Sequence, residues 1–153
     1  MATRSTHVGM VTIPSTRFDT LEVADEAVIH FPLGLIGLPG KHYARVARPG
    51  VNSHFGWLHS VEHAHVAIPV TNPFRWFVSF AIALSDEDLS RVGAIDPGTS
   101  EIHAAVRLDG RSGGLAANLR APIVIVGSVG HQVINHARGA SLQAPLPAAL
   151  RAA

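Results

Sequence analysis

Short apolar runs separated by turn-forming residues are the feature that most constrains the fold of this chain. Fourteen glycines and ten prolines punctuate its 153 residues, so few stretches are long enough for a regular helix. Short alternating runs bounded by such turns are typical of all-β sandwiches and barrels. We therefore predict an all-β single domain with an antiparallel, barrel-like sheet, since closing a sheet removes its exposed edges.

Nine or ten short strands are predicted from the apolar alternation. Phe55, Trp57 and His59 fall on one face of their strand, because side chains alternate with a period of two. In the most aromatic run, Phe77 faces the same way as Arg75, so Phe77 is expected to be either exposed or buried against the helix. The runs cover residues 20–24, 28–31, 43–47, 55–60, 66–70, 74–84, 102–108, 115–119, 123–126 and 131–134.

One short helix is predicted at residues 86–92. Ser85 is a good N-cap, and the three acidic residues that follow it place negative charge at the positive end of the helix dipole. Gly93 can end the helix in the left-handed conformation.

The domain itself is expected to span residues 16–142. Residues 1–15 show no clear period and are expected to form an irregular N-terminal segment. Residues 143–153 form a Pro/Ala-rich tail that we expect to lie loosely on the surface. Within the domain, residues 31–40 hold three glycines and two prolines among apolar residues, which predicts an ordered apolar loop.

Composition excludes several classes of protein. The chain has no cysteine, which removes disulfides and thiolate zinc sites. No run approaches the roughly 18 apolar residues of a membrane span, and the N-terminus lacks a secretory signal, so we expect a soluble, cytoplasmic protein. The net charge is +1, and basic residues do not cluster with aromatic ones, so no direct nucleic-acid partner is expected.

No catalytic or cofactor motif is present in the sequence. No serine lies in a G-x-S-x-G frame, and the glycines of residues 34–40 match neither the phosphate-binding nor the dinucleotide-binding spacing. We therefore expect no enzymatic activity, no catalytic residues and no cofactor.

A histidine-rich stretch offers an alternative function. His59, Glu62, His63 and His65 could together bind zinc, as in a metal-dependent hydrolase or a cupin-like barrel. The favoured interpretation is that His63 and His65 lie in a solvated turn between two strands, so we expect no metal site. A small barrel that binds nucleic acid is a third hypothesis.

An ordered series of motifs resembles the FliW family of bacterial flagellar assembly factors. Single motifs such as LSDEDL carry little information, but seven in the family's order, over about residues 16–134, are specific. The motifs are TRF-x-x-LEV at 16–23, IHFPLGLIGL at 29–38, WLHSVE at 57–62, IPVTNPF at 68–74, LSDEDL at 84–89, ANLRAPIVI at 117–125 and HQVI at 131–134.

The resemblance implies a β-barrel-like domain that binds flagellin in the cytoplasm and has no catalytic activity. It also implies binding to the carbon storage regulator CsrA, an RNA-binding translational repressor. Flagellin and CsrA would compete for binding to this one protein. The concentration of free flagellin would determine how much of the protein is left to bind CsrA, and therefore how strongly flagellin synthesis is repressed. Members of the family tend to be acidic, whereas this chain has a net charge of +1.

Seven residues are predicted to contact these partners. They lie in matching motifs or beside them, and they carry the charged, amide or aromatic groups that protein contacts use. Asn118, Pro122 and Gln132 also lie in motifs, but they are expected to support the backbone instead. The predicted contact residues are Glu62, Asn72, Phe74, Phe77, Asp86, Glu87 and Asp88.

Overall fold

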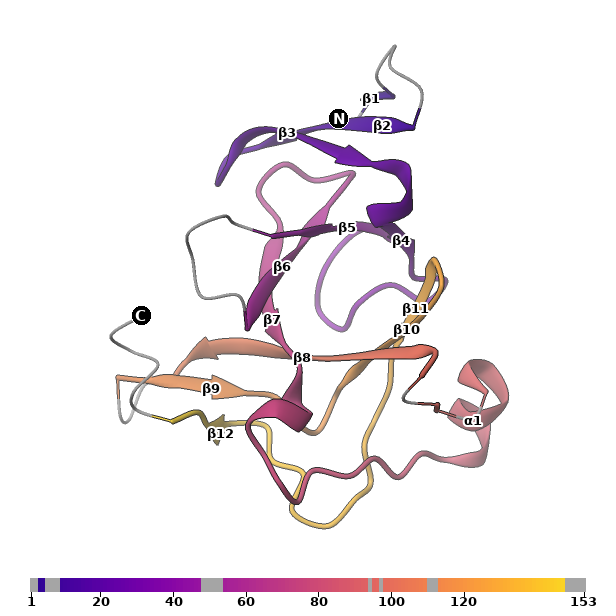
Figure 1. Cartoon of the computed structure of the whole chain (residues 1–153), viewed down its shortest axis with the longest axis vertical. Helices are drawn as coiled ribbons and strands as arrows, with labels where there is room; N and C mark the ends of the chain where they lie inside the picture. Colours follow the sequence, from indigo (N-terminus) through magenta and orange to yellow (C-terminus); the bar gives the residue numbers. More distant parts are fainter. Residues whose placement is uncertain are drawn as a thin grey trace.

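The computed structural model of the chain describes residues 3–4, 9–47, 54–93, 95–96, 98–109 and 113–147. Seven strands form a closed barrel in the order β10-β11-β4-β5-β6-β7-β8, and β8 pairs with β10 to complete the ring (Figure 1). The barrel strands are β4 (Val28–His30), β5 (His42–Val46), β6 (Phe55–Ser60), β7 (Ala67–Thr71), β8 (Ser100–Leu108), β10 (Ile123–Val126) and β11 (Val129–Gln132).

Smaller elements flank the barrel. A three-stranded sheet lies across one end, and β9 and β12 extend the sheet beyond β8 (Figure 1). The remaining elements are β1 (Thr3–Arg4), β2 (Met10–Ser15), β3 (Asp19–Ala24), β9 (Leu115–Ala117), β12 (Ala144–Pro145), the 3-10 helices η1 (Asp25–Ala27) and η2 (Pro73–Arg75), and the helix α1 (Asp86–Val92).

The predicted all-β barrel is confirmed, and so is its single short helix among the described residues. The Oγ of Ser85 accepts from the backbone N–H of Asp88 at 3.2 Å, and Gly93 ends α1 with a φ of 81°. Pairing within the ring is antiparallel except between β11 and β4, which run parallel with Val129 opposite His30. This parallel contact closes the barrel, and the backbone N–H of His30 also donates to Ser128 there.

The predicted strand over residues 74–84 is wrong. The segment begins with η2 and then runs on without joining any sheet. The amide side chain of Asn135 takes the place of a neighbouring strand, because it donates to the carbonyl of Ala81 and accepts from the N–H of Ala83, each at 2.9 Å. Phe77 is half-buried, while the adjacent Val78 is fully exposed.

Both predicted terminal segments also contain regular structure. Within residues 1–15, Met10–Ser15 form β2, which pairs along its whole length with β3, and Thr3–Arg4 pair with β2 as β1. Within residues 143–153, Ala144–Pro145 pair with β9, and the following Leu146 is buried against the barrel. Residues 148–153 lie outside the described part. β2 contains Pro14, and β12 has only two residues, so neither gives a clear strand pattern in the sequence.

The barrel interior is filled by the inward faces of its strands. Phe31 and Tyr43 are fully buried and meet edge to face, with ring centroids 5.8 Å apart. The loop of residues 31–40 is ordered as predicted: Leu35 is buried, and the hydroxyl of Tyr43 donates to the carbonyl of Pro39 at 2.7 Å. No helix in the described ranges is long and apolar enough to cross a membrane.

The three-stranded sheet packs against the outer face of β6. Phe18, at the β2–β3 turn, contacts Trp57 edge to face at 5.4 Å between centroids and lies 6.1 Å from the His59 ring. Phe55 lies on the same side of β6 and stacks on Trp76. The predicted common face of Phe55, Trp57 and His59 therefore packs against other elements.

Candidate partner-binding groove

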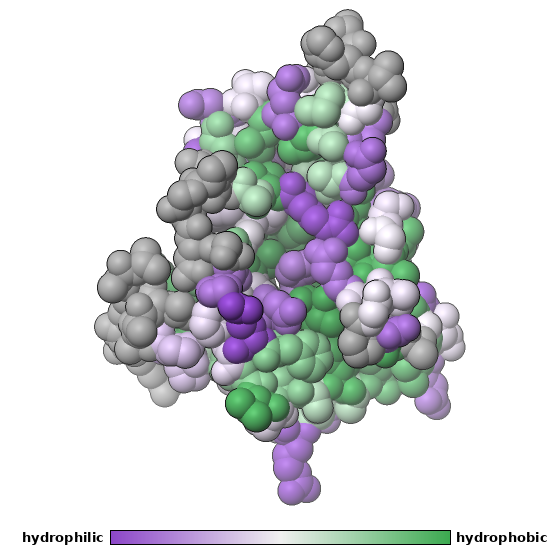
Figure 2. Space-filling model, viewed as in Figure 1, coloured by the Kyte–Doolittle hydropathy of each residue, from purple (hydrophilic) through white to green (hydrophobic). Residues whose placement is uncertain are grey.

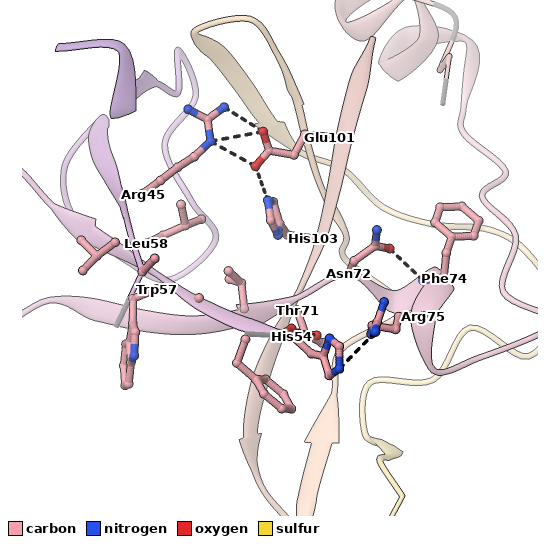
Figure 3. A pocket seen from close by; sticks show the side chains of 15 residues that line it. Arg45, His54, Trp57, Leu58, Thr71, Asn72, Phe74, Arg75, Glu101 and His103 are labelled. Atoms are coloured by element: carbon pink, nitrogen blue, oxygen red, sulfur yellow. Dashed lines mark hydrogen bonds and ion pairs between the residues drawn. The ribbon is translucent and has the colours of Figure 1, made fainter. Parts of the chain in front are cut away.

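An open groove of about 610 Å³ is hollowed into the barrel wall. Its lining comes from β5, β6, β7, η2 and β8, so it brings together residues up to 58 positions apart, from Arg45 to His103. Figure 3 shows Arg45, Glu101 and His103 along one wall, with Asn72, Phe74 and Arg75 at the end of β7. In Figure 2, hydrophilic side chains gather near the middle of this face, with apolar surface below them.

An ion-pair network fixes the first wall. The guanidinium of Arg45 donates from Nε and Nη2 to the two carboxylate oxygens of Glu101, at 3.0 and 2.9 Å. The Nε2 of His103 is bonded to the same carboxylate. Since Arg45 and Glu101 lie on different strands of the barrel, this network holds β5 beside the start of β8.

The same contacts explain the electrostatics of Glu101. The hydrogen bond from His103 favours the ionised carboxylate, and the bond and charge of Arg45 add to it. These contacts outweigh partial burial and lower the pKa of Glu101 to about 2. Glu101 is therefore ionised at neutral pH, and its charge is already matched by Arg45.

The second wall presents donors and an aromatic ring. The Oδ1 of Asn72 accepts from the backbone N–H of Phe74 at 3.0 Å and so caps η2, while Pro73 suits the first position of that helix. The turn leaves Phe74 52% exposed, with its ring against the edge of Phe80. The guanidinium of Arg75 lies 3.1 Å from the Nε2 of His54 across the groove.

Trp57 also lines the groove and is partly buried, because its ring contacts the three-stranded sheet. The guanidinium of Arg17 lies 4.8 Å from the Trp57 ring centroid, and Phe18 packs against the same indole. Trp57 therefore helps to shape the groove, while its indole ring packs against Arg17 and Phe18.

Of the seven predicted contact residues, the groove brings together Asn72 and Phe74. Glu62 lies elsewhere, in the turn after β6, where its carboxylate accepts from the backbone N–H and the Nδ1 of His42 at 3.1 and 2.9 Å. Burial by itself raises the pKa of Glu62, but these bonds from His42 outweigh it and hold the pKa below its usual range.

The other predicted contact residues do not line the groove. Phe77 packs with Phe80 against the cluster around β8 and β9. Glu87 and Asp88 both bond to Arg91 within α1, at 3.0 and 2.8 Å, and Asp86 is exposed. The role of these residues in partner binding stays a prediction.

The histidine-rich stretch does not assemble a ligand set. His59 is fully buried, with its Nε2 2.7 Å from Ser15 Oγ and its Nδ1 2.8 Å from the carbonyl of Ser60, so both ring nitrogens are engaged. His63 and His65 lie in the turn between β6 and β7, as predicted. No group of three or more potential ligands is placed to hold a metal within the described part of the chain.

The remaining motif residues hold the backbone, as expected. The Oδ1 of Asn118 accepts from the N–H groups of Arg120 and Ala121. The amide of Gln132 bridges two loops, since it accepts from Ile36 N–H at 2.7 Å and donates to the carbonyl of Ala121 at 3.0 Å.

Sequence reasoning missed Arg45, Glu101 and His103. They lie in two strands of mixed polar and apolar residues, and the barrel closure that unites them is not visible in local periodicity. The alternation of Glu101 and His103 along one strand face was the one available signal.

With the geometry described, comparison with known proteins shows the family. The model of the FliW protein family matches residues 12–146. The chain belongs to the FliW family. The match starts inside β2 and ends at the buried Leu146, so it takes in the whole barrel and the end strand β12.

Curated relatives carry the same description. The flagellar assembly factor FliW of Azoarcus sp. (strain BH72) is 37% identical over 119 residues, which cover 74% of this chain and 82% of that protein. Its counterpart in Magnetococcus marinus is 34% identical over 114 residues, covering 74% and 70%. That of Desulfitobacterium hafniense (strain Y51) is 32% identical over 124 residues, covering 80% and 82%.

A solved structure shares the fold. The crystal structure of a flagellar assembly factor FliW superposes with a TM-score of 0.75 and 22% sequence identity, covering 89% of this chain and 97% of that chain. This chain and the solved flagellar assembly factor therefore share one overall fold.

Proposed function

We propose that this FliW-family protein binds flagellin in the bacterial cytoplasm and antagonises the translational repressor CsrA. In this proposal it catalyses no reaction and contacts neither nucleic acid nor membrane directly. The observation that carries the proposal is the family match over residues 12–146, with relatives described as flagellar assembly factors.

The geometry of the groove supports a docking role. It is open, it combines charged walls with an exposed aromatic ring, and two motif residues, Asn72 and Phe74, line it. Surfaces of this mixed character are typical of protein contacts, where aromatic and arginine side chains supply most of the affinity.

Partner exchange gives the regulatory logic. Flagellin that accumulates inside the cell occupies this protein, and CsrA then represses flagellin synthesis. When flagellin is exported, the freed protein binds CsrA and relieves repression. Such coupling requires that the two partners lower each other's affinity by the same factor.

Calorimetric titration of the full chain tests the proposal. We expect binding to the cognate flagellin and to CsrA, and we expect saturating flagellin to weaken CsrA binding. The absence of binding to both proteins would refute the proposal. Simultaneous binding without mutual weakening would refute the exchange mechanism.

A further inference from the structure

We propose that the groove binds an acidic peptide segment of a protein partner, through Arg75 and Asn72, with Phe74 beside them for an apolar residue of that segment. The inference deepens the proposed function, on which it rests, because it specifies the chemistry of the segment that docks.

Charge complementarity favours an acidic occupant. The groove holds two arginines and one glutamate, and Arg45 already pairs with Glu101. Arg75 is exposed and contacts no carboxylate among the described residues; its guanidinium reaches only the ring nitrogen of His54. A carboxylate is a stronger acceptor than an imidazole and can take two parallel bonds from one guanidinium.

Asn72 adds a second donor to the same end of the groove. Its side-chain oxygen is used by Phe74 N–H, which fixes the amide, while its NH₂ group bonds to no described residue. Asn72 and Arg75 lie at the two ends of the η2 turn that follows β7, as Figure 3 shows. An amide donor beside a guanidinium suits a carboxylate, or a carboxylate and the peptide carbonyl next to it.

Phe74 favours a peptide that carries an apolar residue next to the acidic one. Phe74 is 52% exposed, and its ring meets that of Phe80 edge to face with 4.9 Å between centroids. Covering such a ring is favourable because apolar area leaves water. A segment in which an acidic residue is followed by an apolar one can engage Arg75 and Phe74 together.

A nucleic acid fits the groove less well. Trp57 is not free to stack on a base, because Arg17 and Phe18 cover its ring. Arg75 is the one arginine of the groove that bonds to no carboxylate of the described residues, which is too little charge for a polyanion. We therefore assign the site to protein.

The test uses fluorescein-labelled ten-residue peptides of alternating Glu and Leu, with matched peptides in which Gln or Lys replaces every Glu. Anisotropy titrations use the full chain, Arg75→Glu, Asn72→Ala and the control Arg138→Glu, an exposed arginine that does not line the groove. We expect the Glu peptide to bind about tenfold more tightly than the Gln peptide, and Arg75→Glu to remove that preference.

Amide chemical shifts locate the bound peptide. We expect the largest perturbations at His54, Asn72 and Arg75, with affinity falling as salt rises. Equal affinity for the Glu and Gln peptides, shifts confined to other surfaces, or an equal loss with Arg138→Glu would overturn the proposal. Tighter binding of a ten-residue uridine RNA than of the Glu peptide would do so as well.

Flagellin titrations with the same variants separate the two proposals. If the wild-type chain binds flagellin or CsrA and Arg75→Glu binds both equally well, the groove proposal fails and the proposed function stands. If the wild-type chain binds neither, the proposed function fails, whatever the peptides show.

Discussion

Replacing Gly130 with alanine tests how the barrel closes. Gly130 lies in β11, beside the parallel contact with β4, and its backbone packs against the ring of Phe31. An added Cβ would lie within 3 Å of three Phe31 ring atoms, a separation that Cβ atoms in proteins essentially never show. Because Phe31 is fully buried among core side chains, its ring has no open space to move into.

Overpacking of this kind costs about 1–3 kcal/mol. For a domain of this size each kcal/mol lowers Tm by roughly 2–4 °C, so a loss near 2 kcal/mol lowers Tm by roughly 4–8 °C. The assay is thermal and urea unfolding followed by circular dichroism. The matched control is Gly56→Ala, also in a barrel strand, where the new Cβ would lie 3.7 Å from the carbonyl of Val46. We expect the control to change stability by less than about 0.5 kcal/mol.

A double-mutant cycle identifies the cause. Phe31→Leu removes the ring that the new methyl group meets, so Gly130→Ala should cost at least about 1 kcal/mol less in the Phe31→Leu background than in the wild type. Additive effects, or a Gly130→Ala variant as stable as the wild type, would refute this account of the barrel seam.

Three further predictions concern stability and titration. The pKa of Glu101 is lowered to about 2, so the stability that the ionised carboxylate contributes is complete above the usual carboxyl pKa near 4.5 and is lost as pH falls through 2. In urea unfolding, Glu101→Gln should therefore lower the free energy of unfolding by about 1 kcal/mol at pH 7, after allowance for solvent screening, and leave it unchanged below pH 2. Tyr43 is the only tyrosine, and burial, with the nearby Glu62 charge, raises its pKa to about 12, so its ultraviolet titration should have a midpoint near 12 when folded and near 10 in urea. Asn135→Ala should cost about 2–4 kcal/mol and increase hydrogen exchange over residues 74–84, because it removes four hydrogen bonds made by a fully buried amide. A loss of stability in Glu101→Gln that stays constant from pH 2 to 7 would contradict the contacts of Glu101 with His103 and Arg45. A tyrosine midpoint unchanged by folding would contradict the burial of Tyr43. Unaltered hydrogen exchange after Asn135→Ala would contradict the bonds of Asn135 to residues 74–84.

The sequence predicted the elements that local chemistry determines. Ser85 and Gly93 mark the ends of α1, and the alternation in β6 identifies which side chains share its outer face. In each case the deciding interactions lie within a few residues of one another. The strand bounds of β6 and β10 were predicted for the same reason.

The failures trace to contacts between distant residues. The segment 74–84 has strand-like alternation, but its backbone partner is the side chain of Asn135, about fifty residues away. The groove has the same origin, because Arg45 and Glu101 meet only when the barrel closes. Asn72 and Phe74 were predicted from the family motif, whereas nothing local pointed to Arg45.

The proposed exchange of flagellin and CsrA on this chain can be measured directly. The most direct measurement is a competition titration in which CsrA is added to the full chain with and without saturating cognate flagellin. The account predicts that CsrA binds the free chain and that flagellin weakens this binding at least about tenfold, equal to 1.4 kcal/mol of coupling. Unchanged CsrA affinity in the presence of bound flagellin would contradict it.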